Sequence, residues 1–227
     1  MGESRRRAAR EFAGRAIGRD RDARRPPGPA RSRRAMTFAE RHFTSQDGLA
    51  LYFRDYGAPD APGVPAVCLT GLTRNAKDFA AFAERLSSKR RVLCPDYRGR
   101  GRSQYDPNWR NYRPQTYLDD VRHMLAITQM HRAVFVGTSM GGLLSAAMAV
   151  MAPASVAGVV MNDCGPDLDP RGLARIFDYI GRDRPKDNWR DAAAELRAMF
   201  PDLPLQGDAG WLEMAHSTYR EGGDGRL

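Results

Sequence analysis

Residues 134–142 read Val-Phe-Val-Gly-Thr-Ser-Met-Gly-Gly. A short β-branched and aromatic run leads into a Gly-x-Ser-x-Gly turn, and the Ala-, Leu- and Met-rich segment that follows is typical of a helix. A strand, a sharp turn carrying a serine and a helix, in this order, are the context of a nucleophile elbow. Gly137 and Gly141, two residues on either side of Ser139, suit a tight turn that leaves no room for a Cβ atom.

This turn also has a plain interpretation, in which two glycines bound an ordinary serine. The flanking strand and helix favour the functional interpretation, because an elbow would lift the Ser139 hydroxyl above the carboxyl edge of a sheet. The helix after Ser139 would then direct amide N–H groups and the positive end of its dipole toward a developing oxyanion. We therefore predict that Ser139 is a nucleophile.

Strands and helices alternate along the body of the chain, which predicts an α/β fold with a mostly parallel sheet and helices on both faces. An opening hairpin is expected about Asp47-Gly48. Asn75 and Thr116 are the expected caps of two helices, with Asp119 and Asp120 in the first turn of the second. The expected strands span residues 41–45, 49–56, 65–69, 91–95, 131–136 and 156–161.

The charge of the chain is concentrated at its N-terminus. Of the net charge of +9, residues 1–35 supply twelve arginines against four acids, so the remaining residues are close to neutral and do not favour a nucleic-acid partner. Residues 1–35 have the Arg-, Ala-, Gly- and Pro-rich composition of a disordered extension, without the apolar region of a secretory signal. We expect Met36 to be the true start of the protein.

The remaining composition indicates a cytoplasmic protein that does not span a membrane. One stretch without charged residues, residues 143–161, is interrupted by Pro153 and divides into a helix, a turn and a strand. Three cysteines, Cys68, Cys94 and Cys164, lie in or beside expected strands, and no Cys-x-x-Cys occurs. We expect buried, reduced thiols and neither disulfides nor a metal site.

Thr70-Gly71-Leu72 follows the third expected strand, and residues 96–103, Asp-x-Arg-Gly-x-Gly-x-Ser, follow the fourth. The elbow follows the fifth. Together and in this order, these motifs resemble the α/β-hydrolase family of serine esterases, lipases and lactonases, whose members often have His-Gly-x where Thr70-Gly71-Leu72 stands. The resemblance implies that Ser139 attacks an ester, lactone or similar acyl bond of a small molecule, without a cofactor or metal. It also implies an oxyanion hole made by the backbone N–H groups of Leu72 and Met140.

The loop at residues 96–103 is expected to be structural, with its charged side chains locked by local hydrogen bonds. Its Gly99-x-Gly101 is not a dinucleotide fingerprint, because the third glycine and the helix that it should open are absent.

A serine nucleophile needs a base, and the family order is Ser, then Asp or Glu, then His. Of four histidines, only His216 follows Ser139, in a segment with the composition of a helix rather than of a loop after a strand. Asp163, at the end of the expected sixth strand, is the candidate acid, and a strand-end turn residue is its plain alternative.

The last third of the sequence contains no credible strand. It contains two amphipathic helices, marked by Leu173, Ile176, Phe177 and Ile180 and by Trp189, Ala193, Leu196 and Phe200, with Asp187 or Asn188 near the second cap. They resemble the helical cap that α/β-hydrolases insert after the sixth strand, so the sequence predicts a C-terminally truncated member that lacks the last strands and leaves the sixth strand as an apolar edge. The expected division is an extension at 1–35, a hydrolase core at 36–165 and a truncated helical cap region at 166–227.

Two alternatives to an active hydrolase remain open at this stage. One is a catalytically incompetent fragment, and the other is a non-catalytic binder of a small molecule on the same scaffold. The sequence indicates neither the substrate nor the oligomeric state.

Overall fold

The computed structural model describes residues 37–165, 167–181 and 185–227. The chain divides into two units, residues 1–35 and residues 36–227. The Arg-rich extension and the proposed start at Met36 both lie outside the described residues.

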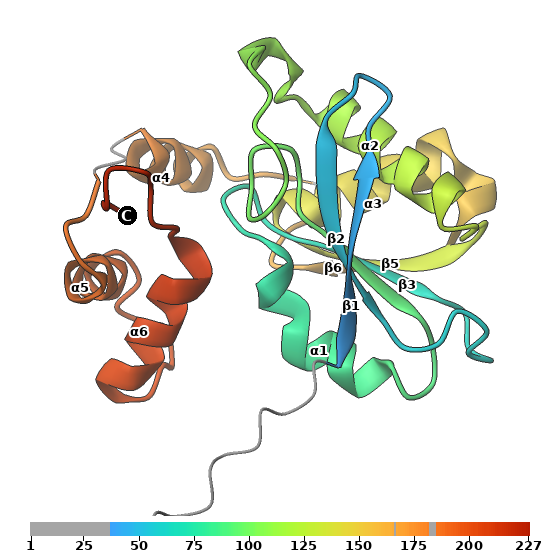
Figure 1. Ribbon diagram of the computed structural model, residues 1–227. Coiled ribbons are helices and arrows are strands. Elements are labelled where there is room, and N and C mark those ends of the chain that lie inside the picture. The colour runs from blue at the N-terminus through green and yellow to red at the C-terminus, as the bar shows by residue number, and fades with distance from the viewer. Residues whose placement is uncertain (1–36, 166, 182–184) are drawn as a thin grey trace, which may run out of the picture. The chain divides into compact units, whose positions relative to one another are not determined.

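A sheet of six strands, in the order β1-β2-β4-β3-β5-β6, forms the centre of the described chain (Figure 1). β1 and β2 form the expected antiparallel hairpin, and β2 also runs antiparallel to β4. The other neighbours are parallel, which confirms the mostly parallel sheet. The strands are β1 (Phe38–Thr44), β2 (Ala50–Tyr56), β3 (Ala66–Leu69), β4 (Val92–Pro95), β5 (Ala133–Thr138) and β6 (Val156–Asn162).

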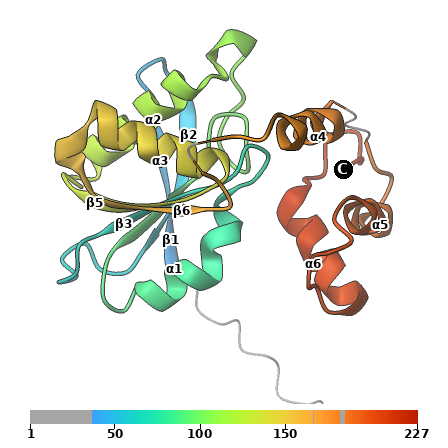
Figure 2. The same ribbon diagram turned by 180° about the vertical axis from the view of Figure 1, so that it is seen from behind.

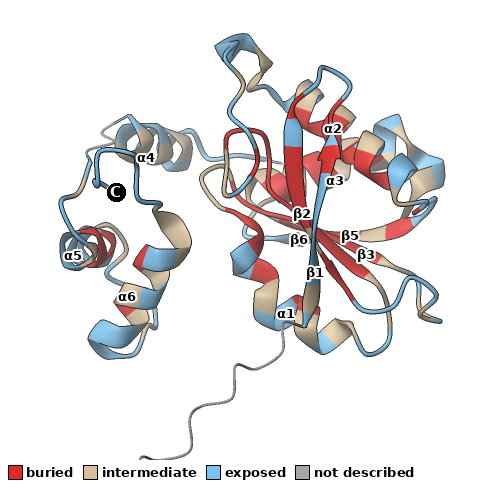
Figure 3. Ribbon diagram, in the orientation of Figure 1, coloured by how far each residue is buried: buried red, intermediate tan, exposed pale blue. Residues whose placement is uncertain are grey.

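Helices cover both faces of this sheet, as predicted. α2 (Pro114–Ile127) and α3 (Met140–Met151) lie on one face, and α1 (Ala80–Leu86) lies on the other (Figures 1 and 2). Successive residues of β3 serve opposite faces, since Val67 and Leu69 belong to the apolar cluster under α2 and α3, whereas Ala66 and Cys68 belong to the cluster under α1. Burial is therefore concentrated along the central strands (Figure 3).

The expected helix caps are partly confirmed. The Asn75 side chain accepts a hydrogen bond from Lys77 N (3.1 Å), but the turn that it caps is a 3-10 helix, Ala76–Phe79, which leads into α1. The cap at Thr116 was wrong, because α2 begins two residues earlier at Pro114, with Arg113 at the cap position. Proline suits a first helical position, since its φ is preset and it has no N–H to leave unpaired. Asp119 and Asp120 consequently lie beyond the first turn.

The last part of the described chain is helical, with α4 (Pro170–Ile180), α5 (Trp189–Met199) and α6 (Gly207–Thr218). Asn188 caps α5 as expected, accepting hydrogen bonds from the N–H groups of Arg190 and Asp191. α5 and α6 pack on each other through a small apolar cluster that includes Leu196 and Trp211. No strand follows Asn162 among the described residues.

Two short 3-10 turns complete the list of elements, Trp109–Asn111 and Pro153–Ser155. The three cysteines are free, as expected, although Cys164 is only half-buried. In the part of the chain that the structure describes, no helix is both long enough and apolar enough to cross a membrane.

Candidate active site

Ser139 lies at the junction of β5 and α3 in a strained backbone conformation, with φ 51° and ψ −118°. Its N–H donates to Asn162 O (2.9 Å), and its C=O accepts from Gly142 N (2.9 Å) and Leu143 N (3.2 Å). The backbone of Ser139 is thus tied to β6 on one side and to the first turn of α3 on the other. Its side chain is half-exposed, and the hydroxyl makes no hydrogen bond to any other described residue.

The glycines around Ser139 allow α3 to approach the sheet closely, as the sequence predicted. A Cβ atom on Gly137 would lie closer than 3.0 Å to the backbone of Gly141, and one on Gly141 would lie closer than 3.0 Å to the carbonyl of Leu69. A Cβ atom on Gly142 would meet Cys164 Sγ equally closely. The turn is therefore built from backbone-to-backbone contacts that no larger residue permits.

The loop after β3, residues 70–72, borders Ser139. A Cβ atom built on Gly71 would lie 3.8 Å from Ser139 Cβ. Within the described residues, neither the N–H of Leu72 nor that of Met140 donates a hydrogen bond, and Met140 is the first residue of α3, where such groups have no partner inside the helix. Both backbone groups expected in the oxyanion hole are thus unpaired beside the elbow.

The carbonyl groups of this loop, in contrast, all accept hydrogen bonds. Tyr97 Oη donates to Thr70 O (3.2 Å), and Arg100 Nε donates to Leu72 O (2.9 Å). Arg74 N donates to Gly71 O (3.1 Å). The motif Asp-x-Arg-Gly-x-Gly-x-Ser leaves positions 97 and 100 unspecified. The sequence therefore did not predict a role for Tyr97 or Arg100.

Asp96 holds the loop after β4 together, as expected of a structural residue. Its carboxylate accepts hydrogen bonds from Ala76 N (2.6 Å) and Arg102 N (2.9 Å), and burial raises its pKa. A Cβ atom on Gly101, whose φ is +49°, would collide with this carboxylate.

The side chain of Arg98, in the same loop, lies in the interior of the core. It is almost fully buried and contacts three carboxylates, those of Asp47 (2.7 Å), Asp106 (2.6 Å) and Asp120 (2.7 Å). The hydrogen bond from Arg98 lowers the pKa of Asp47, whereas burial raises the pKa of Asp120. The interpretation of this motif as a locked structural loop is confirmed, and its partners reach beyond the loop to β1–β2 and α2.

The sequence profile of the alpha/beta hydrolase fold matches residues 65–204, which is more than half of the chain and includes the elbow. The chain belongs to the α/β-hydrolase fold family.

Individual relatives of the chain agree with that assignment. A crystal structure of an alpha/beta hydrolase from Novosphingobium aromaticivorans is 42% identical with a TM-score of 0.77, covering 84% of this chain and 67% of that one. A 3-hydroxybutyrate-oligomer hydrolase from Cupriavidus necator is 31% identical over 164 residues, which are 72% of this chain and 56% of the relative. A 2-(acetamidomethylene)succinate hydrolase from Mesorhizobium japonicum is 28% identical over 175 residues, 75% of this chain and 61% of the relative. The chain thus spans little more than half the length of these last two relatives.

The two other candidate site residues, the acid Asp163 and the base His216, are placed very differently. Asp163 follows β6 directly, with φ 57° and an exposed side chain, and its neighbour Cys164 reaches the start of α3. His216 lies in α6, where its ring stacks on Trp189 with 3.9 Å between ring centroids and its carbonyl accepts from Lys77 Nζ (2.8 Å). Among the described residues, no hydrogen bond joins His216 to Ser139 or Asp163.

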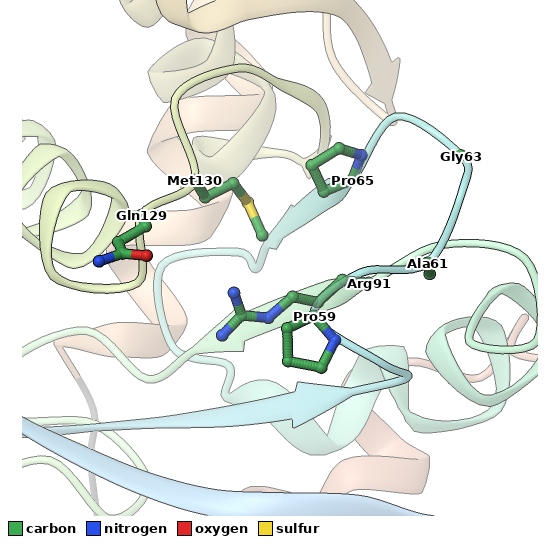
Figure 4. Close-up of a pocket in the computed structure, with 7 residues that line it drawn as sticks. All are labelled: Pro59, Ala61, Gly63, Pro65, Arg91, Gln129 and Met130. Atoms are coloured by element: carbon green, nitrogen blue, oxygen red, sulfur yellow. The ribbon is translucent and has the colours of Figure 1, made fainter.

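A cavity of about 70 Å³ lies at the amino ends of the strands, at the opposite end of the sheet from the elbow (Figure 4). Pro65, Arg91 and Met130, three of its lining residues, precede β3, β4 and β5, so the cavity opens at the amino ends of strands whose carboxyl ends carry the site. The Arg91 guanidinium is already engaged there by Asp55 and by Thr128 O. Among the described residues, no cluster of three or more His, Cys, Asp or Glu side chains could hold a metal ion.

Proposed function

We propose that this chain is an acyl hydrolase in which Ser139 is the nucleophile and the backbone N–H groups of Leu72 and Met140 form the oxyanion hole. The observation that carries the proposal is the backbone of Ser139, held at φ 51° between β5 and α3, with its hydroxyl half-exposed and unpaired among the described residues. Such strain persists only where the surroundings impose it, and it is concentrated at functional sites.

In the proposed reaction, Ser139 Oγ attacks the carbonyl carbon of an ester and forms an acyl-serine as the alcohol leaves. Water then attacks the acyl carbon, and the acid is released with the serine restored. The negative charge on the carbonyl oxygen in each step lies at the N-terminus of α3, where the Met140 N–H and the helix dipole stabilise it. Each lost oxyanion donor typically lowers kcat about a hundred- to a thousand-fold.

The proton of Ser139 requires a base, and His216 with Asp163 as its acid is the pair that this sequence offers in the family order. In the described conformation the His216 ring stacks on Trp189, so it would have to leave that ring to reach the nucleophile. Replacing His216 by Asn tests this assignment, which predicts loss of most of the activity.

The proposed substrate class is a short ester of a hydroxy acid. It is supported by the relative named as a 3-hydroxybutyrate-oligomer hydrolase, which is 31% identical over 164 residues including the elbow region. We further propose a core at residues 36–165, a helical cap region at 166–227 and a cytoplasmic location, which is supported by three free thiols.

Hydrolysis of 3-hydroxybutyrate dimers and trimers, followed by chromatography of the released acid, tests this function. The proposal predicts a rate well above the acceleration of about a thousand-fold over buffer that hydrolases retain from binding and the oxyanion hole alone. The Ser139→Ala variant should fall to about that residual level while keeping its circular dichroism spectrum. A Ser139→Ala variant that retains the rate would contradict the proposal.

A non-catalytic binder is the second candidate, and the position of His216 favours it, because its ring stacks on Trp189 and makes no hydrogen bond to Ser139 among the described residues. This candidate predicts that a 3-hydroxybutyrate dimer binds in calorimetry but is recovered intact.

A further inference from the structure

Three successive carbonyl groups in the loop beside Ser139 are held by three different donors. Tyr97 Oη binds Thr70 O (3.2 Å), Arg74 N binds Gly71 O (3.1 Å) and Arg100 Nε binds Leu72 O (2.9 Å). Two of these donors are side chains from the loop after β4, which is otherwise remote in sequence from residues 70–72. All three carbonyl groups of the loop are therefore engaged, whereas the Leu72 N–H and the buried Thr70 Oγ1 have no hydrogen-bond partner among the described residues.

The direction of the Leu72 N–H follows from the planarity of the peptide bond. This N–H and the Gly71 carbonyl belong to one trans peptide unit and point in opposite directions. Because Arg74 N draws the Gly71 carbonyl into the turn, the Leu72 N–H points out of it. The next peptide unit carries the Leu72 carbonyl, and Arg100 holds that unit in place. Leu72 is thus flanked by two anchored peptide planes, which leaves its own dihedral angles little freedom.

We infer that Arg100 is a positioning residue for the oxyanion hole, acting on the Leu72 N–H through the Leu72 carbonyl. This inference rests on the proposed function for its effect on the reaction, whereas its effect on the loop does not. Preorganised donors stabilise an oxyanion strongly because they need no reorganisation during the reaction. Loss of Arg100 would let the Leu72 unit rotate, so part of that stabilisation would be lost.

The chemistry of arginine suits this role better than that of lysine. The planar Arg100 guanidinium donates simultaneously to Leu72 O and, through Nη1, to Gly99 O (3.1 Å). It thereby joins the loop after β3 to the turn of the loop after β4, and Gly99 in that turn is held in a left-handed conformation with φ +69°. The single ammonium group of lysine lacks the rigid fork that bridges both carbonyls.

Arg102, two residues along the same loop, offers a matched control. Its exposed side chain pairs with Glu40 and lies over the Tyr52 ring (4.8 Å to the centroid), away from residues 70–72. The variants are Arg100→Gln, Arg100→Lys and Arg102→Gln in the full chain. Two quantities are measured in each: hydrogen exchange of the Arg74 amide, which donates to Gly71 O, and the kinetics of Ser139 modification by a fluorophosphonate, resolved into a binding constant and a maximal rate.

We expect Arg100→Gln to raise exchange of the Arg74 amide about tenfold and to lower the maximal modification rate about tenfold, with the binding constant within about twofold of wild type. Arg100→Lys should lie between wild type and Arg100→Gln, and it also serves if the Gln variant does not fold. Arg102→Gln should match wild type. Arg100 variants that match Arg102→Gln in both quantities would overturn the inference.

If the proposed function is wrong, the two measurements give a different result. Wild-type protein that is never modified at Ser139 would remove the proposed reaction. The exchange measurement alone then decides the role of Arg100 in fixing the loop, and unchanged exchange in Arg100→Gln would overturn it.

Discussion

Ser139 has a backbone conformation that can persist only because its neighbours pack without side chains. The carbonyl of Leu69 lies where Gly141 would carry a Cβ atom, and the backbone of Gly141 lies where Gly137 would carry one. These contacts bring the first turn of α3 against the end of β3, and Ser139 between them has φ 51°. The shape of the site therefore depends on glycine at positions 137 and 141 as well as on the Ser139 hydroxyl.

A methyl group at position 141 should therefore be severely destabilising. We predict that Gly141→Ala lowers the free energy of unfolding by about 3 kcal/mol, the upper end of the cost of overpacking, because the obstructing atoms are backbone and cannot rotate away. Gly158→Ala in β6 is the control, since a Cβ atom there meets nothing within 4 Å. Urea denaturation measures both variants, and equal stability would show that the elbow is less tightly packed than described here.

The ion pair with Arg98 should make the contribution of Asp47 to the stability of the folded protein dependent on pH. The hydrogen bond from Arg98 lowers the pKa of Asp47 below its usual 3.8, so the folded state favours the ionised carboxylate. The resulting stability is present above the unfolded pKa and is lost as the pH falls through the lower, folded pKa. We predict that Asp47→Asn destabilises the protein at pH 6 and that this difference shrinks as the pH falls toward about 3. Urea unfolding of both proteins across this range would contradict the prediction if the difference grew.

At the scale of elements, β6 differs from the other outermost strand of the described sheet. β1 carries Glu40 and Arg41, whereas β6 has no charged residue and exposes Val160 (51%) and Met161 (37%). An uncharged apolar edge is a template for pairing with another chain. The sequence predicted this edge, since its valines ended with the sixth strand and only helical periodicity followed.

A charge on β6 should reduce self-association. We predict that Val160→Lys lowers the light scattering of concentrated protein without changing its thermal unfolding midpoint by more than a few degrees, because the side chain is already half in solvent. Ala39→Lys on β1, where charges already occur, is the control and should leave scattering unchanged. Scattering that falls equally in both variants would indicate a general charge effect and not pairing through the β6 edge.

At the scale of the whole molecule, the fold could be predicted because its signals were local. A β-branched strand, a glycine-bounded turn and an Ala-rich helix follow one another within one short stretch, and the same alternation recurs along the chain. The contacts around the site could not be predicted in this way. Arg100 reaches Leu72, and Arg98 reaches Asp47, across gaps in sequence that no periodicity encodes. The start of α2 at Pro114 was also missed, because the threonine at 116 has a side chain that suits a helix cap. The proline at 114 suits the first helical position, and the helix begins there.

Fluorophosphonate modification, followed by intact mass measurement and peptide mapping, tests whether Ser139 is the attacking residue. We expect one adduct, on the peptide that contains Ser139, which disappears in Ser139→Ala. The adduct should persist in Ser155→Ala, whose serine lies at the opposite end of β6. A folded protein that remains unmodified, or that is modified at another residue, would show that Ser139 is not the nucleophile.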